Sequence, residues 1–254
     1  MTVESNAMQT LDEKHHHTEN CLKCAMAPIC FPTPETDQAL DLSQHFLSKQ
    51  LNVSTGTKII AESSPAEAIY AVTSGTFKLT ATDHQGKEKI VGFRYPGEMI
   101  GEDAIYPQKY AYSAISLTNA LLCKVKLEPL KACSALVPSL QQGMFTLLSR
   151  QGYLAHCEFQ SLVAHRSAEH LLAAFLLNLY KRNPLEQEES PSHILTTDAA
   201  VELTMSRDNI ANYLGLRRET LSRVLSKFKH ENLINITGKV LVLNDIKKLT
   251  ILAN

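Results

Sequence analysis

The sequence of 254 residues has no run of about eighteen consecutive apolar residues, which is what a membrane-spanning helix requires. Its first twenty residues are polar and contain no apolar core, so they do not have the pattern of a signal peptide. We therefore expect a cytoplasmic protein that makes no contact with a membrane. In the cytoplasm cysteine thiols stay reduced, which makes structural disulfides uncommon.

Markers of enzymatic chemistry are also missing from the sequence. It contains no nucleotide fingerprint, no substrate motif and no paired acid and base that would indicate a catalytic pocket. A redox enzyme that carries an iron–sulfur cluster is therefore the weakest functional alternative, and we do not expect an enzyme. The net charge of −1 argues neither for nor against nucleic acid as a partner.

The chain from about residue 52 to 125 has the pattern of short β-strands. The segments TKIIAES, AIYAVTSGTFKLTAT and EKIVGFRYPGEMIG alternate β-branched or aromatic residues with polar ones. Glycines separate these segments at turn positions. This pattern predicts a small antiparallel β-barrel or roll.

A long helix is predicted from Pro138 to about Arg166, because apolar residues recur there at helical spacing. Its apolar stripe predicts pairing with the same helix of a second copy, and the polar residues within it make that pairing marginal enough to be switched. The residues assigned to this dimer interface are Met144, Leu147, Leu148, Gln151, Leu154, Ala155, Glu158 and Leu162.

The C-terminal part has the pattern of a winged helix-turn-helix. Ser206 is expected to cap a first helix over residues 207–214, and Gly215 permits the tight turn to a second helix. The segment LINITGKVLVLN predicts a hairpin that turns at Gly238. Residues 205–231 carry six Lys or Arg against three acidic residues, a small basic patch.

The polar side of the second helix carries the side chains expected to contact DNA. The residues assigned to DNA binding are Glu219, Ser222, Arg223, Arg218 and Arg217. Arg223 is assigned to a guanine and Glu219 to a base amino group, whereas Arg218 suits either a guanine or a phosphate. The alternative interpretation is an amphipathic surface helix with a solvated charged face.

Three cysteines stand close together in the segment CLKCAMAPIC, at Cys21, Cys24 and Cys30. This spacing suits a disulfide knot, a zinc site or an iron–sulfur cluster, and a reducing compartment weakens the first of these. Zinc would accept the three thiolates together with His17 or Cys123. A cluster usually takes four thiolates, for which Cys123 is the best fourth ligand.

The segments NIANYLGLRRETLSRVLSKFKHENLI and GFRYPGEMIGEDAI resemble the oxygen-sensing fumarate and nitrate reductase regulator (FNR/ANR) branch of the CRP/FNR transcription regulator superfamily. The resemblance covers about residues 20 to 250. It implies an α+β fold with an N-terminal cyclic-nucleotide-binding-like β-roll, a long dimerisation helix and a C-terminal winged helix-turn-helix. The expected domains are a disordered tail at 1–20, a cluster-binding loop and β-roll sensor at 21–137, the dimerisation helix at 138–167 and the DNA-binding domain at 168–254.

The resemblance also implies a cofactor and a function. It assigns Cys21, Cys24, Cys30 and Cys123 to a [4Fe-4S] cluster that is intact at low oxygen and favours a homodimer. The dimer would bind a TTGAT-N4-ATCAA-like palindrome in double-stranded DNA, contact RNA polymerase and control anaerobic genes. The alternative within the same fold is a DNA-binding regulator whose cysteines hold zinc or nothing, and which oxygen does not switch.

Two positions depart from the family's pattern. Nucleotide-binding members place an arginine beside the cyclic phosphate, where this chain has Tyr112. Burying a phosphate without that charge would be costly, so we expect no cyclic nucleotide as a partner. Relatives often hold an acidic residue near the place of Ala155 in the long helix, and we expect Glu158 to supply that charge instead.

Overall fold

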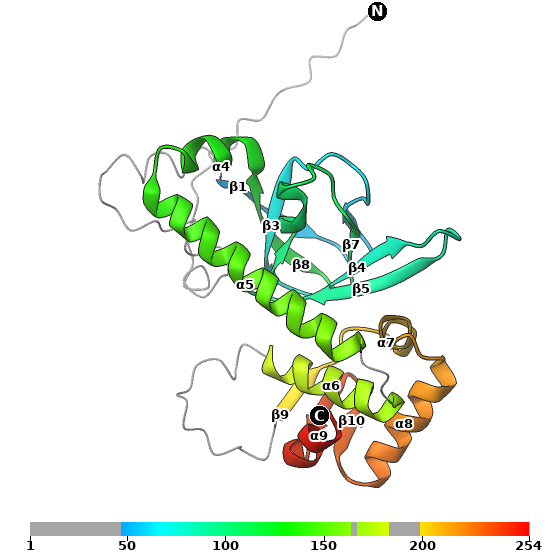
Figure 1. Ribbon diagram of the computed structural model, residues 1–254. Helices are drawn as coiled ribbons and strands as arrows, with labels where there is room; N and C mark the ends of the chain where they lie inside the picture. Colours follow the sequence, from blue (N-terminus) through cyan, green and yellow to red (C-terminus); the bar gives the residue numbers. More distant parts are fainter. Residues whose placement is uncertain (1–46, 164–166, 183–198, 254) are drawn as a thin grey trace, which may run out of the picture.

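A computed structural model describes residues 47–163, 167–182 and 199–253 (Figure 1). The predicted tail at 1–20 and the cysteine segment at 21–30 lie outside these residues. The fold class is the one that the sequence predicts: a β-roll, a long helix that crosses it, and a C-terminal helix-turn-helix with a small sheet. In the part of the chain that the structure describes, no helix is long and apolar enough to cross a bilayer.

The roll consists of two four-stranded antiparallel sheets. The first has the order β1–β8–β3–β6, formed by β1 (Leu47–Val53), β8 (Ala120–Lys126), β3 (Ala68–Ser74) and β6 (Met99–Ile100). The second has the order β2–β7–β4–β5, formed by β2 (Lys58–Ile60), β7 (Ser113–Ser116), β4 (Phe77–Thr82) and β5 (Glu88–Arg94). Side chains of both sheets share one apolar cluster that includes Val72, Phe77 and Leu122.

The other face of the first sheet is covered by helices. Alternate residues of β3 point to opposite faces, so Val72 enters the interior of the roll while Ile69 faces outward. The helices α4 (Leu127–Ser134) and α5 (Pro138–Val163) pack on this outer face (Figure 1). Leu140 of α5 is only 1% exposed there.

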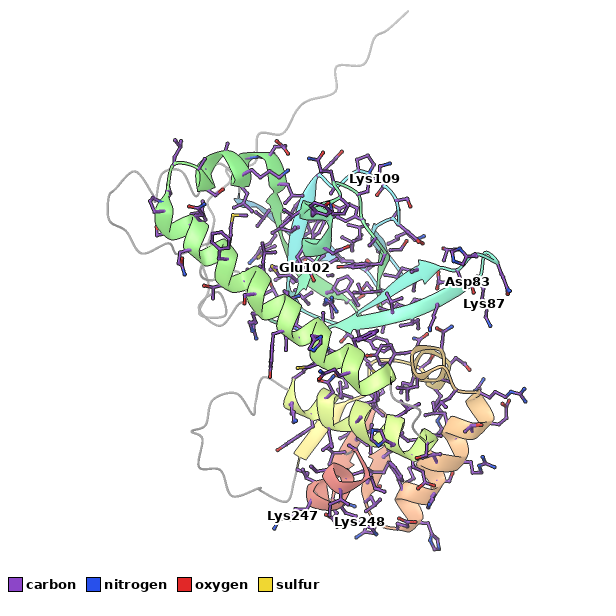
Figure 2. All side chains as sticks on the ribbon, in the orientation of Figure 1. Asp83, Lys87, Glu102, Lys109, Lys247 and Lys248 are labelled. Atoms are coloured by element: carbon purple, nitrogen blue, oxygen red, sulfur yellow. The ribbon has the colours of Figure 1, made fainter. Side chains whose placement is uncertain are left out.

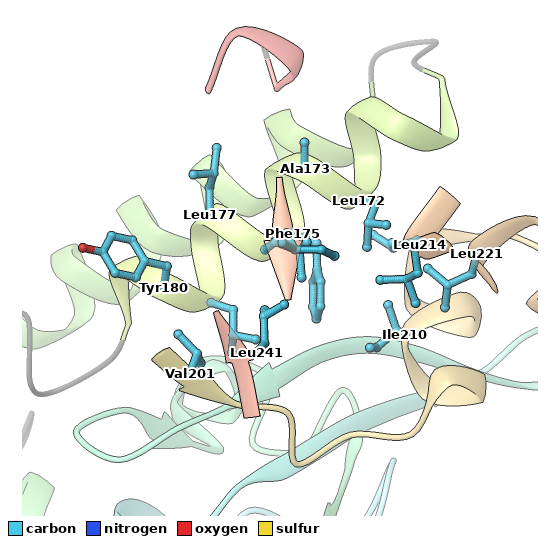
Figure 3. Close-up of a cluster of buried hydrophobic side chains, with 14 of the residues drawn as sticks. Leu172, Ala173, Phe175, Leu177, Tyr180, Val201, Ile210, Leu214, Leu221 and Leu241 are labelled. Atoms are coloured by element: carbon cyan, nitrogen blue, oxygen red, sulfur yellow. The ribbon is translucent and has the colours of Figure 1, made fainter. Parts of the chain in front are cut away.

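In the described residues of the C-terminal domain, which the sequence predicts to bind DNA, four helices pack around a three-stranded sheet. The helices are α6 (Ala168–Lys181), α7 (Arg207–Leu214), α8 (Arg218–His230) and α9 (Ile246–Leu252). The sheet has the order β10–β11–β9, formed by β10 (Ile234–Thr237), β11 (Val240–Leu243) and β9 (Ala199–Glu202). Figure 3 shows apolar side chains of α6, α7, α8 and the sheet meeting in one core.

The predicted Ser206 cap and the predicted turns of this domain are confirmed, and Ser167 forms a further cap. The Ser167 hydroxyl accepts the backbone N–H of His170 at 3.2 Å, which begins α6, and the Ser206 hydroxyl accepts that of Asn209 at 3.1 Å, which begins α7. Gly215 ends α7 in the left-handed conformation, with φ 66°. The hairpin of β10 and β11 turns at Gly238 as expected.

The sequence did not predict α4, β9, α9 or the 3-10 helix η1 (Glu102–Ile105). Each has only four to eight residues, which is too short for a periodic pattern to stand out.

Strand β5 joins the roll to the DNA-binding domain. The Phe93 ring meets Phe175 of α6 and Tyr213 of α7 in edge-to-face geometry, with centroid distances of 6.2 and 5.3 Å. The side-chain amide of Asn212 on α7 accepts the N–H of Ile90 at 2.7 Å and donates to the carbonyl of Glu88 at 3.4 Å. The two halves of the chain therefore share apolar and polar contacts along one strand.

Replacing Phe228 with alanine tests the core of the DNA-binding domain. Phe228 is fully buried at the centre of that core, so Phe228→Ala should lower the free energy of unfolding by about 3–5 kcal/mol. Denaturant unfolding followed by circular dichroism measures the change. Val240→Ala, at a position that is 47% exposed, is the matched control and should cost far less. Equal losses in the two variants would contradict this packing.

Candidate DNA interface and sensor site

The residues predicted to contact DNA lie on the solvent side of α8 and at its start. Arg217, Arg218, Glu219 and Arg223 are exposed and Ser222 is half-buried. The opposite side of the helix is buried in the domain core through Leu221, Val224, Leu225 and Phe228. The fold therefore brings all five predicted residues to one accessible surface.

Arg218 has a partner that the sequence did not reveal. Its Nη1 lies 3.3 Å from Oδ2 of Asp208 in the first turn of α7. Both side chains are more than half exposed, so this ion pair contributes little to stability. Its effect is to hold the Arg218 guanidinium beside α7 in the free protein.

A second ion pair joins α8, the helix predicted to read DNA bases and called the reading helix below, to α6. Nζ of Lys227 lies 2.6 Å from Oε1 of Glu169, and this hydrogen bond raises the pKa of Lys227. Lys227, Lys229 and His230 occupy the last turn of α8, where positive charge complements the helix dipole.

Three cysteines lie among the described residues. Cys123 is half-buried in β8, with Sγ 3.5 Å from the hydroxyl oxygen of Thr73. Cys133 is buried in α4, where burial raises the pKa of its thiol, and Cys157 is exposed on α5. The half-buried Cys123 thiol is more accessible to a metal ion than the buried Cys133 thiol.

The other predicted ligands, Cys21, Cys24 and Cys30, lie outside the described residues. Within the ranges that the structure does describe, no group of three or more His, Cys, Asp or Glu side chains could hold a metal ion. Of the predicted ligand set, the structure therefore describes the position of Cys123 alone.

Tyr112 lies beside Gly101 and Glu102 of the roll. It is buried, its hydroxyl oxygen accepts the N–H of Gly101 at 3.1 Å, and the same hydroxyl lies 3.5 Å from Oε2 of Glu102. Burial and the neighbouring Glu102 charge raise the pKa of Tyr112 well above its ordinary value. The phenol is therefore neutral and donates to the carboxylate.

Glu102 has further partners in the same region (Figure 2). Its Oε1 lies 3.4 Å from Nη2 of Arg94 and accepts a hydrogen bond from Nε2 of Gln151 on α5 at 3.0 Å. The sequence analysis singled out Tyr112 but neither Glu102 nor Arg94. It assigned Gln151 to a different surface.

Some α5 residues predicted to form the dimer interface pack against the roll of the same chain, and others are exposed to solvent. Leu147 and Gln151 are only 4% and 9% exposed, because they pack against the roll of the same chain. The prediction must be corrected for these two residues: helical periodicity identifies an apolar stripe but not what covers it.

The remaining predicted interface residues differ in exposure. Met144 and Leu148 are partly buried at the edge of the contact with the roll, Leu154 is half-buried and Ala155 is exposed. The side chains of Glu158 and Leu162 lie outside the description. Among the described side chains of α5, the large apolar ones that are exposed are Phe145, Tyr153 and Phe159. The sequence analysis did not assign these three residues to the interface.

The Tyr112 hydroxyl should make stability fall in alkali. The unfolded chain loses the phenol proton above its ordinary pKa of 10.0, whereas the folded chain retains it, so rising pH favours unfolding. The stability advantage of the wild type over Tyr112→Phe should shrink above about pH 10, by up to about 1.4 kcal/mol per pH unit. Denaturant unfolding of both proteins at several pH values measures it. A constant difference would show that Tyr112 is not held as a neutral phenol.

Comparison with known proteins agrees with this architecture. Residues 50–135 match a family model described as a cyclic nucleotide-binding domain, and residues 172–252 match one described as a Crp-like helix-turn-helix domain. The chain is 31% identical to electron transport regulator A of Shewanella oneidensis over 234 residues, which cover 92% of this chain and 90% of that protein. It is 30% identical to the fumarate and nitrate reduction regulatory protein of Salmonella typhi over 234 residues, with the same coverage.

Solved structures share the fold at lower identity. FixK2 from Bradyrhizobium japonicum superposes with a TM-score of 0.69 at 22% identity, covering 81% of this chain and 97% of that one. A CRP/FNR-family transcriptional regulator from Thermus thermophilus superposes with a TM-score of 0.60 at 24% identity, covering 81% and 98%. Its relatives are transcription regulators and not enzymes, and this chain belongs to the CRP/FNR family.

Proposed function

We propose that this protein is an oxygen-responsive transcription regulator. A [4Fe-4S] cluster held by Cys21, Cys24, Cys30 and Cys123 would favour a DNA-binding homodimer at low oxygen. Family membership supports DNA binding, and relatives named for fumarate and nitrate reduction and for anaerobic regulation support the oxygen signal. The observation that carries the proposal is the setting of Cys123, a half-buried thiol on the sheet that α5 covers.

The chemistry of Cys123 fits a cluster ligand. Cluster iron is bound by thiolates, and hydrogen bonds to the sulfur tune a cluster. The Thr73 hydroxyl, 3.5 Å from Sγ of Cys123, can donate such a bond. When bound, the cluster supplies an oxygen-sensitive redox centre. With three ligands in one segment and the fourth in β8, a change at the cluster would act directly on the first sheet of the roll.

The exposed side of α5 supports a homodimer. Phe145, Gly152 and Phe159 are seven residues apart and all exposed, and Leu148 and Ala155 fall between them at heptad spacing. Gly152 and Ala155 are small enough to let two helices approach closely. We place the dimer seam on this stripe, beside the face of α5 that contacts the roll.

A homodimer would present two copies of α8 and could therefore bind a palindromic DNA site. Two copies of α8 would enter successive major grooves about 34 Å apart. Arg223 and Glu219 would read bases of a TTGAT-like half-site, with Ser222 between them, and Arg217 and Arg218 would lie near the phosphates.

RNA polymerase would be contacted by another surface. The tip of the β4–β5 hairpin is a candidate, because the Asp83 carboxylate accepts the N–H groups of Gln85 and Lys87 and so stiffens it (Figure 2).

Spectra of protein purified without oxygen test the cluster. The wild type should be brown, with a broad band at roughly 400 nm that bleaches in air as the dimer dissociates in gel filtration. Cys123→Ser should lose the band, whereas Cys133→Ser, which alters a buried thiol of α4, should keep it. A colourless wild type that contains zinc and keeps its oligomeric state in air would support the alternative of a regulator that oxygen does not switch.

Substitutions in α8 separate base reading from phosphate contact. Arg223→Ala should cost about 1–3 kcal/mol on the palindrome and relax selectivity at one base pair. Arg218→Ala should weaken binding to all sequences evenly and reduce the salt dependence of binding, if it contacts phosphate. Fluorescence anisotropy with single-base variants of the site, at several salt concentrations, measures both.

Lys247→Ala removes a positive charge from the exposed side of α9 and is the matched control for both arginine variants (Figure 2). Its DNA affinity should match the wild type. A base-selective loss in Arg218→Ala would mean that Arg218 reads sequence. An even loss in Arg223→Ala would remove it from base reading.

A further inference from the structure

Cys123 belongs to a row of paired residues that crosses the first sheet. It pairs with Ala71 on β3, and Ala71 pairs with Met99 on β6. Directly paired residues of antiparallel strands point to the same face, which here is the face under α5. Ala71 and Met99 are fully buried in the cluster that contains Leu147 of α5, and Cys123 lies at its edge. Side chains in contact therefore connect Cys123 to Met99.

Met99 stands between two glutamates that reach different helices. Oε1 of Glu102 accepts a hydrogen bond from Gln151 in the middle of α5 at 3.0 Å. Oε1 of Glu98 lies 3.4 Å from Nε of Arg182, the residue that ends α6. The side chains of Glu102 and Glu98 are only 9% and 10% exposed, so both contacts are shielded from water, where charge interactions are stronger.

The segment that holds the two glutamates is tied together internally. Nε of Arg94 donates to the carbonyl of Met99 at 2.9 Å, and its Nη2 forms the ion pair with Glu102. The N–H of Tyr95 donates to Oε2 of Glu98 at 3.2 Å, and the Arg182 guanidinium lies over the Tyr95 ring, 5.5 Å from its centroid. A shift of Met99 would therefore move both carboxylates together.

We propose that the turn from Arg94 to Glu102 couples the state of Cys123 to both helices, and that its two glutamates divide the task. Glu102 is the positioning residue for α5 and so controls dimerisation. Glu98 is the positioning residue for α6 and so controls the placement of the DNA-binding domain. The change that starts at Cys123 rests on the proposed function, whereas the division between the two glutamates rests on these contacts alone.

The contacts give each glutamate its own measurable effect. Gln151 fixes the rotation of α5 on the roll, and that rotation decides whether Phe145 and Phe159 face a partner helix. Arg182 ends the helix that packs against α8 and α9, so its position sets where the reading helix lies. Loss of the first contact should weaken dimerisation, and loss of the second should weaken DNA binding by a dimer that is already formed.

Two conservative variants test this division. Glu102→Gln and Glu98→Gln keep the side-chain shape and remove the charge, and Glu128→Gln does the same at an exposed position of α4 as the matched control. Sedimentation gives the dimer dissociation constant of cluster-loaded and cluster-free protein without oxygen. Anisotropy at protein concentrations above that constant gives the DNA affinity of the dimer.

Glu102→Gln should raise the dimer dissociation constant about tenfold and leave the DNA affinity of the dimer within about twofold. Glu98→Gln should do the reverse. In Glu102→Gln the ratio of dimer constants between cluster-free and cluster-loaded protein should also shrink, which a merely structural role would not cause. If Glu102→Gln does not fold, Gln151→Met tests the same contact by removing the donor of the hydrogen bond to Glu102.

The outcomes separate this inference from the proposed function. If both glutamate variants change both measurements alike, or match Glu128→Gln, the division of roles is overturned. If Glu102→Gln weakens dimerisation but keeps the wild-type ratio, the turn holds α5 without coupling it to the cluster, which also overturns the inference. If wild-type dimerisation ignores the cluster, the proposed function fails, while cluster-free protein still shows whether the two glutamates act separately.

Discussion

The buried carboxylate of Glu102 is the contact on which the arrangement of the roll and the long helix depends. A buried charge is costly unless several donors surround it, and here the donors come from three places: Arg94 on β5, Tyr112 before β7 and Gln151 on α5. Each donor satisfies the carboxylate only if its own element is correctly placed. The requirement to satisfy one charge therefore adds a polar constraint to the apolar packing of α5 on the sheet.

The same contacts bear on the expectation that this chain binds no cyclic nucleotide. The model of a cyclic nucleotide-binding domain matches residues 50–135, and the family resemblance predicts that Tyr112 stands where nucleotide-binding members carry an arginine for the phosphate. The tyrosine hydroxyl and Arg94 both approach Glu102, so the polar groups of this region satisfy one another within the chain. The Glu102 carboxylate is thus satisfied by side chains of this chain.

The sequence predicted those features whose signals are local. The Ser206 cap, the Gly215 turn and the wing hairpin each depend on a few neighbouring residues, and the structure confirms them. The partners of Glu98 and Glu102 could not be predicted, because Arg182 and Gln151 lie far along the chain and share no periodic pattern with the turn. For a related reason, the sequence analysis assigned one apolar stripe of α5 wholly to the dimer interface. Periodicity finds apolar residues but does not show whether the chain's own sheet or a partner helix covers them. The set of four cysteine ligands stays a prediction, and the structure describes the position of Cys123 alone among them.

Asn212 has a consequence for the solubility of this protein. Strand β5 is the edge of its sheet, and an edge strand offers unpaired backbone groups to any other strand that meets it. The Asn212 side chain occupies the N–H of Ile90 and the carbonyl of Glu88, so the DNA-binding domain caps the edge of the sensor sheet. Any movement that carries α7 away from the roll uncovers that edge. If the DNA-binding domain reorients as the proposed switch requires, keeping this edge covered would limit how far α7 can move from the roll.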